Sequence, residues 1–399
     1  MIYFVVLALL LILTVRYDIN GKTEYRNQWY NGVLVILILI AGLRFRLGED
    51  TLNYMYYFYN DFPNLFDLDI DTFIISDQPP LWILLNSIVK TFGGRFFVVQ
   101  LIQATILNTL VLKYFKKHSS FPFACVALYF LWRYQWFSMV VMKAAVALSI
   151  MLFANDYFLD KKYLKGSLLM LLATGFHQSS VVMFVVPFLT FLRFNVVGIM
   201  MIIIAYFLGV FLQNQLGDIF TLFEGAQGVS DKLDNYMDSG FMTTEDYNIY
   251  YFIFNIFIFV IYSVLSIVYL KRNCKNSPVL KLEPILLLTL IFLAMQLSIN
   301  VMYRYFYALS PYIIIFVVQY LVEFSNNSSS LKKSLSYLRS FVIISPLLAS
   351  FMYIHNPFTY PGFNPYSSVI ERSIDEDREK FYETRTHYGN RYQKNRDYY

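Results

Sequence analysis

Charged residues are scarce in this chain of 399 residues: they make up 15% of it, whereas hydrophobic residues make up 57%. That balance excludes a soluble domain of this length, because apolar runs long enough to span a lipid bilayer recur along the whole chain. Backbone groups inside a bilayer must find their hydrogen-bond partners within the protein, so these runs are predicted to be helices. The sequence therefore predicts an all-α polytopic integral membrane protein.

Cysteine is nearly absent as well. The two cysteines, Cys125 in an apolar run and Cys274 in a basic loop, fit neither a disulfide framework nor a metal site. The four histidines are dispersed and the acids of the polar loops are scattered, so no cluster of metal ligands is expected. No basic patch has the spacing of a nucleic-acid interface. We therefore expect no metal, no cofactor and no nucleic acid.

The N-terminal segment lacks a positive leader and a small-residue cleavage site, so we expect a retained helix. We predict about 12 transmembrane helices, plus a short re-entrant or interfacial helix at 79–92. These helices form a membrane domain of residues 1–354, which a polar C-terminal tail of residues 355–399 follows. The tail is expected to be flexible; alternatively, its part 360–366 folds back over the functional site. The predicted spans are 1–15, 29–43, 96–112, 121–137, 138–157, 164–176, 179–192, 196–212, 250–270, 284–299, 301–322 and 341–354.

The lysines and arginines of the short loops predict the orientation, because such loops stay in the cytoplasm. All the basic loops can be cytoplasmic together only if the N-terminus is outside and 79–92 does not cross. If 79–92 does cross, the lysines of 113–117 are forced outside, so the pattern favours the non-crossing interpretation. The acidic loops 44–78 and 214–248 then lie outside. The basic loops are 16–26, 113–117, 161–165, 193, 271–281 and 332–339.

The stretch from Arg44 to Tyr54 concentrates charge where an apolar helix ends. It holds Arg44, Arg46, a glycine and two acids, of which the second is Asp50. Charged groups at the mouth of a membrane helix cost free energy unless they pair or bind something, so they indicate a functional site. The alternative is a cationic anchor at the lipid interface followed by a turn.

The same topology places further polar residues near the same membrane face. Lys143 lies about one and a half turns into its helix and can alternatively snorkel to the interface. His177 lies in a tight turn, which it can simply cap. Arg304, between Tyr303 and Tyr305, can instead anchor an aromatic belt. The set also includes Arg133 and Gln135.

The motif Gly42-Leu-Arg44-Phe-Arg46-Leu-Gly48-Glu-Asp50, followed by Tyr54, resembles an element of the EpsG family of Wzy-like bacterial exopolysaccharide and O-antigen polymerases. The resemblance continues in order through Lys143 and Ala147, 173–179, Tyr303-Arg304-Tyr305 and Asn364-Pro365-Tyr366. Two departures stand out. Lys143-Ala144 replaces the family's Arg-Gln, which keeps the charge but loses a bidentate fork. Asp77-Gln78-Pro79 replaces its Glu-Pro.

The resemblance implies a membrane polymerase that joins lipid-linked oligosaccharide repeat units at the outer face of the bacterial inner membrane. Undecaprenyl diphosphate would be the carrier, membrane lipid and other polysaccharide assembly proteins would be partners, and the fold would be a metal-independent glycosyltransferase of the GT-C type. The expected catalytic residues are His177, Asp50, Arg46, Arg304 and Lys143. The expected substrate-binding residues are Arg44, Arg133, Gln135, Tyr54, Tyr303 and Tyr305.

These residue types suit that chemistry, because the lipid diphosphate gains negative charge as it leaves the sugar. Arginines can stabilise that charge with paired donors. His177 suits the base that takes the acceptor proton, with Asp50 as its rival. Two alternatives share these features: a flippase or transporter of the lipid-linked sugar, which should show internal repeats that we do not find, and a glycan ligase. A purely structural role would leave Arg46, Lys143 and Arg304 unexplained.

Overall fold

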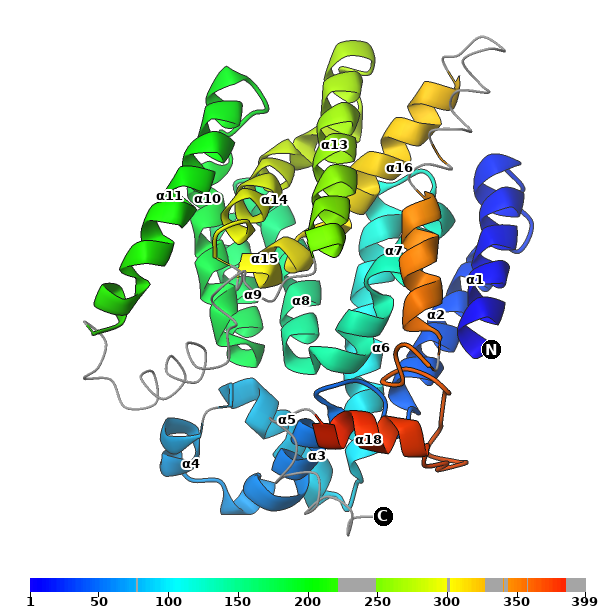
Figure 1. The fold of residues 1–399 in the computed structure, drawn as a ribbon, viewed down its shortest axis with the longest axis vertical. Helices are drawn as coiled ribbons and strands as arrows, with labels where there is room; N and C mark the ends of the chain where they lie inside the picture. The colour runs from blue at the N-terminus through cyan, green and yellow to red at the C-terminus, as the bar shows by residue number, and fades with distance from the viewer. Residues whose placement is uncertain are drawn as a thin grey trace. The chain divides into compact units, whose positions relative to one another are not determined.

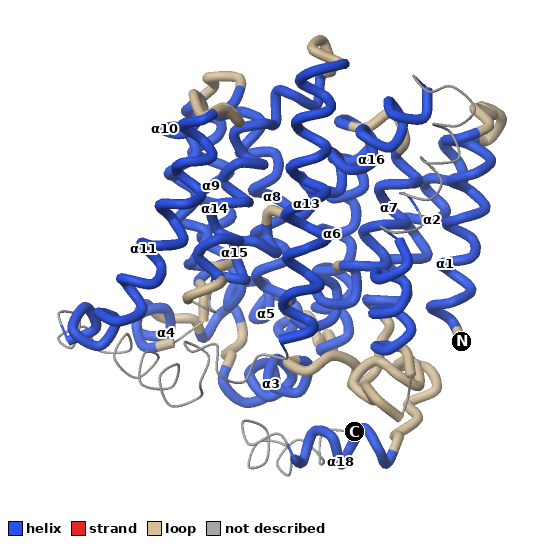
Figure 2. Tube along the Cα trace, turned by 45° about the horizontal axis from the view of Figure 1, so that its top comes forward, coloured by secondary structure: helices blue, strands red, loops and turns tan. Residues whose placement is uncertain are grey.

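The structure is a computed structural model that describes residues 1–76, 78–221, 249–299, 302–326, 340, 344–356 and 358–384 (Figure 1). Across these ranges every regular element is a helix, as the tube in Figure 2 shows, which confirms the predicted all-α class. Four helices are long and apolar enough to span a membrane: Ile2–Ile19, Phe96–His118, Met142–Leu159 and Pro278–Gln296. Other apolar helices have 10–17 residues, so the count of 12 spans stays a prediction.

The chain divides into two compact units. Unit 1 consists of Met1–Ala154, Leu164–Phe184 and Ile344–Tyr399, and unit 2 of Asn155–Tyr163 and Val185–Ile343. Most of the predicted loop 214–248 lies outside the described residues, because the structure describes nothing between 222 and 248.

Unit 1 contains the N-terminal helices, the connection 43–95 that follows Arg26–Gly42, and the C-terminal segment. The predicted span 121–137 is shorter than expected, because the helix ends before Arg133 and the chain turns through a separate π-helix. The elements of unit 1 are α1 (Ile2–Leu13), η1 (Thr14–Ile19), α2 (Arg26–Gly42), α3 (Thr51–Tyr56), η2 (Tyr57–Asp61), η3 (Leu65–Asp67), α4 (Ile70–Ile75), α5 (Pro80–Thr91), α6 (Phe96–His118), α7 (Pro122–Trp132), η4 (Trp136–Val140), most of α8 (Met142–Leu159), α9 (Tyr163–Phe176), η5 (Gln178–Val185), the helix Ile344–Ile354 and α18 (Glu376–Thr384).

Helices α2 and α6 are antiparallel and very close. A Cβ atom at Gly42 would lie 2.8 Å from the Cα atom of Leu101, so only glycine allows this approach. At the other end of the pair, the Tyr30 hydroxyl donates to the Leu112 carbonyl at 2.7 Å. The connection 43–95 therefore starts and ends at the same end of the pair. Its longest helix, α5, has 12 residues, which reach only about 18 Å of a hydrocarbon core about 30 Å thick. This geometry supports the non-crossing interpretation of 79–92.

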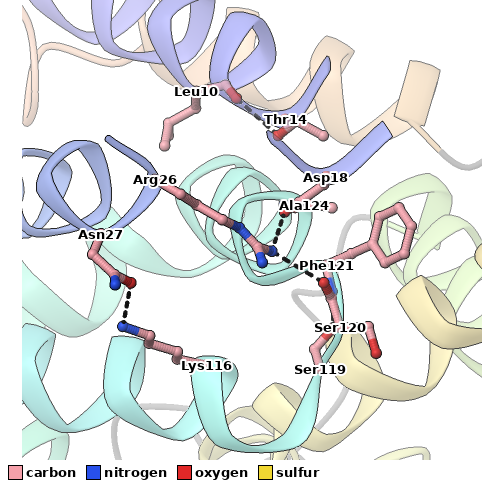
Figure 3. A network of polar contacts seen from close by, with 10 residues as sticks. All are labelled: Leu10, Thr14, Asp18, Arg26, Asn27, Lys116, Ser119, Ser120, Phe121 and Ala124. Atoms are coloured by element: carbon pink, nitrogen blue, oxygen red, sulfur yellow. Dashed lines mark hydrogen bonds and ion pairs between the residues drawn. The ribbon is translucent and has the colours of Figure 1, made fainter. Parts of the chain in front are cut away.

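The opposite end of the α2–α6 pair holds the two predicted cytoplasmic loops of unit 1 (Figure 3). Arg26 pairs with Asp18 at 3.1 Å and donates to the Ser120 carbonyl at 3.2 Å, while Lys116 donates to the Asn27 side chain at 2.9 Å. Loops that are about a hundred residues apart in sequence thus meet at one end. This end of unit 1 is its basic end, as the lysine and arginine pattern predicts.

Unit 2 also gathers basic loops at one end. Glu283 accepts from Lys271 at 2.7 Å and from the backbone amide of Phe194, and Asp160 accepts from Lys281 at 2.5 Å. The predicted span 301–322 is divided at Leu309 into two helices. The elements are α10 (Val186–Leu189), α11 (Val196–Thr221), α13 (Ile249–Asn273), η6 (Pro278–Leu282), α14 (Glu283–Gln296), α15 (Tyr303–Ala308) and α16 (Ser310–Asn326).

Candidate functional site

The loop after α2 has a backbone that few sequences can adopt. Arg46 has a φ of 53° and Gly48 a φ of 96°, both in the left-handed region. A non-glycine residue such as Arg46 adopts this region at a cost of about 1–3 kcal/mol, so its surroundings must hold it there. At Gly48 a Cβ atom would lie 2.2 Å from the Met139 carbonyl oxygen. The Gly48 of the sequence motif is therefore required by both its φ angle and the lack of space.

Arg44 is fully buried beneath this loop. Its guanidinium donates to the Leu47 carbonyl at 3.2 Å, to the Met139 carbonyl at 3.4 Å and to the Ala41 carbonyl. Burial lowers the pKa of Arg44 to about 10, so the side chain still carries its charge at neutral pH. These contacts tie the end of α2 to η4. The predicted role of Arg44 in substrate binding stays a prediction.

The C-terminal segment pairs with the loop through its backbone. The amide of Phe45 donates to the Ser367 carbonyl at 2.8 Å, and the amide of Gly48 donates to the Gly362 carbonyl at 3.0 Å. In the other direction, the amide of Val369 donates to the Leu43 carbonyl at 2.8 Å. Part of the polar tail thus folds back onto the Arg44 loop, which is the second of the two alternatives for 360–366. Residues 385–399 lie outside the described part of the chain.

Arg46, a predicted catalytic residue, pairs with α18. Its guanidinium lies 3.0 Å from a carboxylate oxygen of Glu379, and the two side chains are only 2% and 11% exposed. The Tyr382 hydroxyl donates to the Arg46 carbonyl at 3.0 Å and to the Gly48 carbonyl at 3.3 Å. Sequence reasoning missed both α18 residues. A signal was present at Asp375, which caps the helix by accepting from the Arg378 amide at 3.0 Å.

An aromatic cluster underlies this part of unit 1. The ring of Tyr54 packs edge-on against Trp82 at 5.6 Å, and both belong to a buried cluster that includes Met142 and Tyr382. Phe176 packs against the same cluster. Met142 directly precedes Lys143, and Phe176 directly precedes His177. The cluster therefore brings these two predicted catalytic residues to the end of unit 1 that holds Arg46.

Lys143 and His177 are both half-buried there. The Lys143 ammonium donates to the Gln78 side chain at 2.9 Å. The end of α9 approaches α5 closely, since a Cβ atom at Gly175 would lie 2.6 Å from the Leu81 side chain. The His177 amide donates to the Ala173 carbonyl at 2.9 Å, which closes the last turn of α9. Asp50, the rival base, precedes α3 at its N-terminus.

Arg133 and Gln135 are buried in the turn between α7 and η4. The guanidinium of Arg133 lies 4.2 Å from the centre of the Trp132 ring. Gln135 lies 3.1 Å from His355 Nε2, and His355 Nδ1 lies 2.7 Å from the Phe351 carbonyl oxygen. Burial lowers the pKa of His355 to about 4, so this imidazole is neutral at physiological pH and can accept from Gln135. The binding roles predicted for Arg133 and Gln135 stay predictions.

Arg304, Tyr303 and Tyr305 belong to unit 2. Tyr305 stacks on Phe292 at 5.0 Å, and the Arg304 guanidinium lies 5.9 Å from the Tyr303 ring centre. They lie beyond the end of α14 that is farther from Glu283 and its basic loops. Within the residues that the structure describes, no group of three or more His, Cys, Asp or Glu side chains could hold a metal ion.

Unit 1 therefore brings Arg44, Arg46, Tyr54, Lys143 and His177 to one end, opposite its basic loops. A family model described as the EpsG family matches residues 27–368, which is most of the chain. No curated protein and no solved structure matched. The family match includes each of the predicted site residues but ends before α18. On this evidence the chain belongs to the EpsG family and is a helical membrane protein related to polysaccharide biosynthesis.

Proposed function

We propose that this protein is a polymerase that joins undecaprenyl-diphosphate-linked oligosaccharide repeat units into exopolysaccharide, capsule or O-antigen. The reaction would take place at the outer face of the bacterial inner membrane. The observation that supports this most is the gathering of Arg46, Lys143 and His177 at the end of unit 1 away from its basic loops. The positive-inside rule assigns the basic end to the cytoplasm, so the opposite end faces outward. GT-C architecture and a multi-pass topology of about 12 spans are part of the same proposal.

In the proposed reaction, a hydroxyl oxygen of the acceptor repeat unit attacks the anomeric carbon of the lipid-linked donor chain. The bond between that carbon and the diphosphate oxygen breaks, and undecaprenyl diphosphate leaves with the electron pair. Its added negative charge is stabilised by cations that are already in place, of which Arg46 and Lys143 lie at one end of unit 1. His177 accepts the hydroxyl proton, with Asp50 as the alternative base.

The experiment that tests this proposal is length profiling of the glycan in a strain from which the gene is deleted. We expect single repeat units on the lipid carrier at the outer leaflet, because units would still be made and moved but no longer joined. Complementation with the wild-type gene should restore the long polymer. Accumulation confined to the inner leaflet would instead identify a flippase, and full-length chains that remain unattached would identify a ligase.

A further inference from the structure

We propose that Glu379 and Tyr382 of α18 are positioning residues for Arg46, so that the C-terminal segment 361–382 completes the polymerase site. This inference rests on the proposed function, in which Arg46 stabilises the leaving diphosphate. Neither residue lies within 27–368, the range that the family model matches. The segment holds both the backbone and the side chain of Arg46.

The C-terminal segment supports an unfavourable backbone conformation at Arg46. Arg46 has a φ of 53°, which an arginine does not adopt without support. The Tyr382 hydroxyl bonds the carbonyl oxygens of Arg46 and Gly48, the two left-handed residues of the loop, at 3.0 and 3.3 Å. On either side of Arg46 the loop amides donate to carbonyls of the C-terminal segment, Phe45 to Ser367 and Gly48 to Gly362, which fixes the loop. The C-terminal segment thus stabilises the left-handed backbone conformation of Arg46.

The side chain is held by charge. The Glu379 carboxylate lies 3.0 Å from a terminal nitrogen of the Arg46 guanidinium. A buried arginine with a carboxylate on one side keeps a fixed orientation, because rotation would break a charge-assisted bond. Glu379 therefore fixes the orientation of the Arg46 guanidinium.

The segment is itself rigidly attached. Arg378, which is fully buried, donates to the carbonyl of Pro361 at 3.2 Å and to that of Pro365. Tyr360 donates to Glu49 of the Arg44 loop, and Tyr382 belongs to the aromatic cluster that also contains Tyr54 and Trp82. Position errors of about 1 Å at a reacting centre can cost about 10²-fold in rate. A carboxylate attached in this way can provide that precision.

The test compares Glu379→Gln and Tyr382→Phe with wild type, using purified full-length protein and lipid-linked repeat units. Both changes keep the side-chain shape, and Glu376→Gln is the matched control, since Glu376 is an exposed acid on the same helix. We expect kcat to fall roughly 10- to 100-fold in both variants with KM changed much less, and the control to match wild type. If Glu379→Gln does not accumulate in the membrane, Tyr382→Phe supplies the comparison.

A double-mutant cycle separates positioning from a general structural role. In a chain that already carries Arg46→Ala, adding Glu379→Gln should change kcat by less than about twofold, because both act through the same guanidinium. A full additional loss would show that Glu379 acts elsewhere and would overturn the proposal. A Glu379→Gln enzyme that is as fast as wild type, or faster, would overturn it as well. If wild type itself joins no repeat units, the proposed function fails, whereas failure of the cycle alone leaves that function intact.

Discussion

At the scale of single residues, the family motif combines two different requirements. Gly42 and Gly48 are needed for space: the first lets α6 approach α2, and the second lies against the Met139 carbonyl. Arg44 and Arg46 are only two positions apart, yet one binds backbone carbonyls beneath the loop and the other a carboxylate on α18. Sequence spacing could identify both arginines as candidates, but it could not separate them, because their partners come from distant parts of the chain.

Replacing Gly48 by alanine should strongly destabilise the protein. The new Cβ atom would overlap the Met139 carbonyl, and alanine would have to adopt a φ of 96°. Together these effects should lower the free energy of unfolding by at least about 2 kcal/mol. Gly32→Ala is the matched control, because nothing lies within 4 Å of a Cβ atom at that helical position. Thermal unfolding of both variants in detergent provides the measurement; equal melting temperatures would contradict the loop geometry described above.

At the scale of elements, the helices were predictable where apolar runs are long. They were poorly predictable where backbone turns determine the point at which a helix ends. The runs that became α1, α2 and α13 were placed to within about three residues at each end, because long apolar runs of this kind favour a helix. Helix α6 begins where predicted but extends to His118, beyond the predicted end at 112. The division of 301–322 at Leu309 depends on packing that periodicity does not contain. Helix α18 was missed because its composition is polar, although the cap at Asp375 and the acids of its first turn were visible.

The return of 43–95 to one end of the α2–α6 pair predicts a labelling pattern. In a chain whose Cys125 and Cys274 are replaced, single cysteines at Asn60 and Phe92 should both react with a membrane-impermeant thiol reagent in intact spheroplasts. Cysteines at Lys22 and Ser120, which lie at the basic end, should react only after the membrane is opened. All four positions are exposed, so accessibility within the protein does not limit the comparison. Labelling of Asn60 and Phe92 from opposite sides would mean that α5 crosses the membrane.

At the scale of the whole molecule, the cations predicted to take part in the reaction are divided between the two units. Arg46 and Lys143 belong to unit 1, whereas Arg304 belongs to unit 2. The positive-inside rule predicts that these cations share one membrane face. Within each unit, taken by itself, the basic loops gather at one end. Glu379, the partner of Arg46, and Gln78, the partner of Lys143, could be identified only from the structure. Neither lies near its cation in sequence.

Arg46→Ala, Lys143→Ala and Arg304→Ala should each reduce polymer synthesis about 10²- to 10³-fold, because in the proposed reaction each removes one donor to the developing charge. The amount of protein in the membrane, measured by immunoblotting, should stay at the wild-type level. Lys281→Ala is a suitable control, because that cation pairs with Asp160 among the basic loops of unit 2. Polymer of normal length and amount from two of the three variants would show that these cations have structural roles.

The pairing of Arg46 with Glu379 also has a consequence for biosynthesis. The two residues are 333 positions apart, so the carboxylate is made long after the arginine. At about 5 to 20 residues per second, the ribosome needs roughly 20 to 70 s to cover that distance. Throughout this interval the nascent chain contains Arg46 but not Glu379. Products of premature termination would therefore lack the residue that, in the proposal above, orients Arg46.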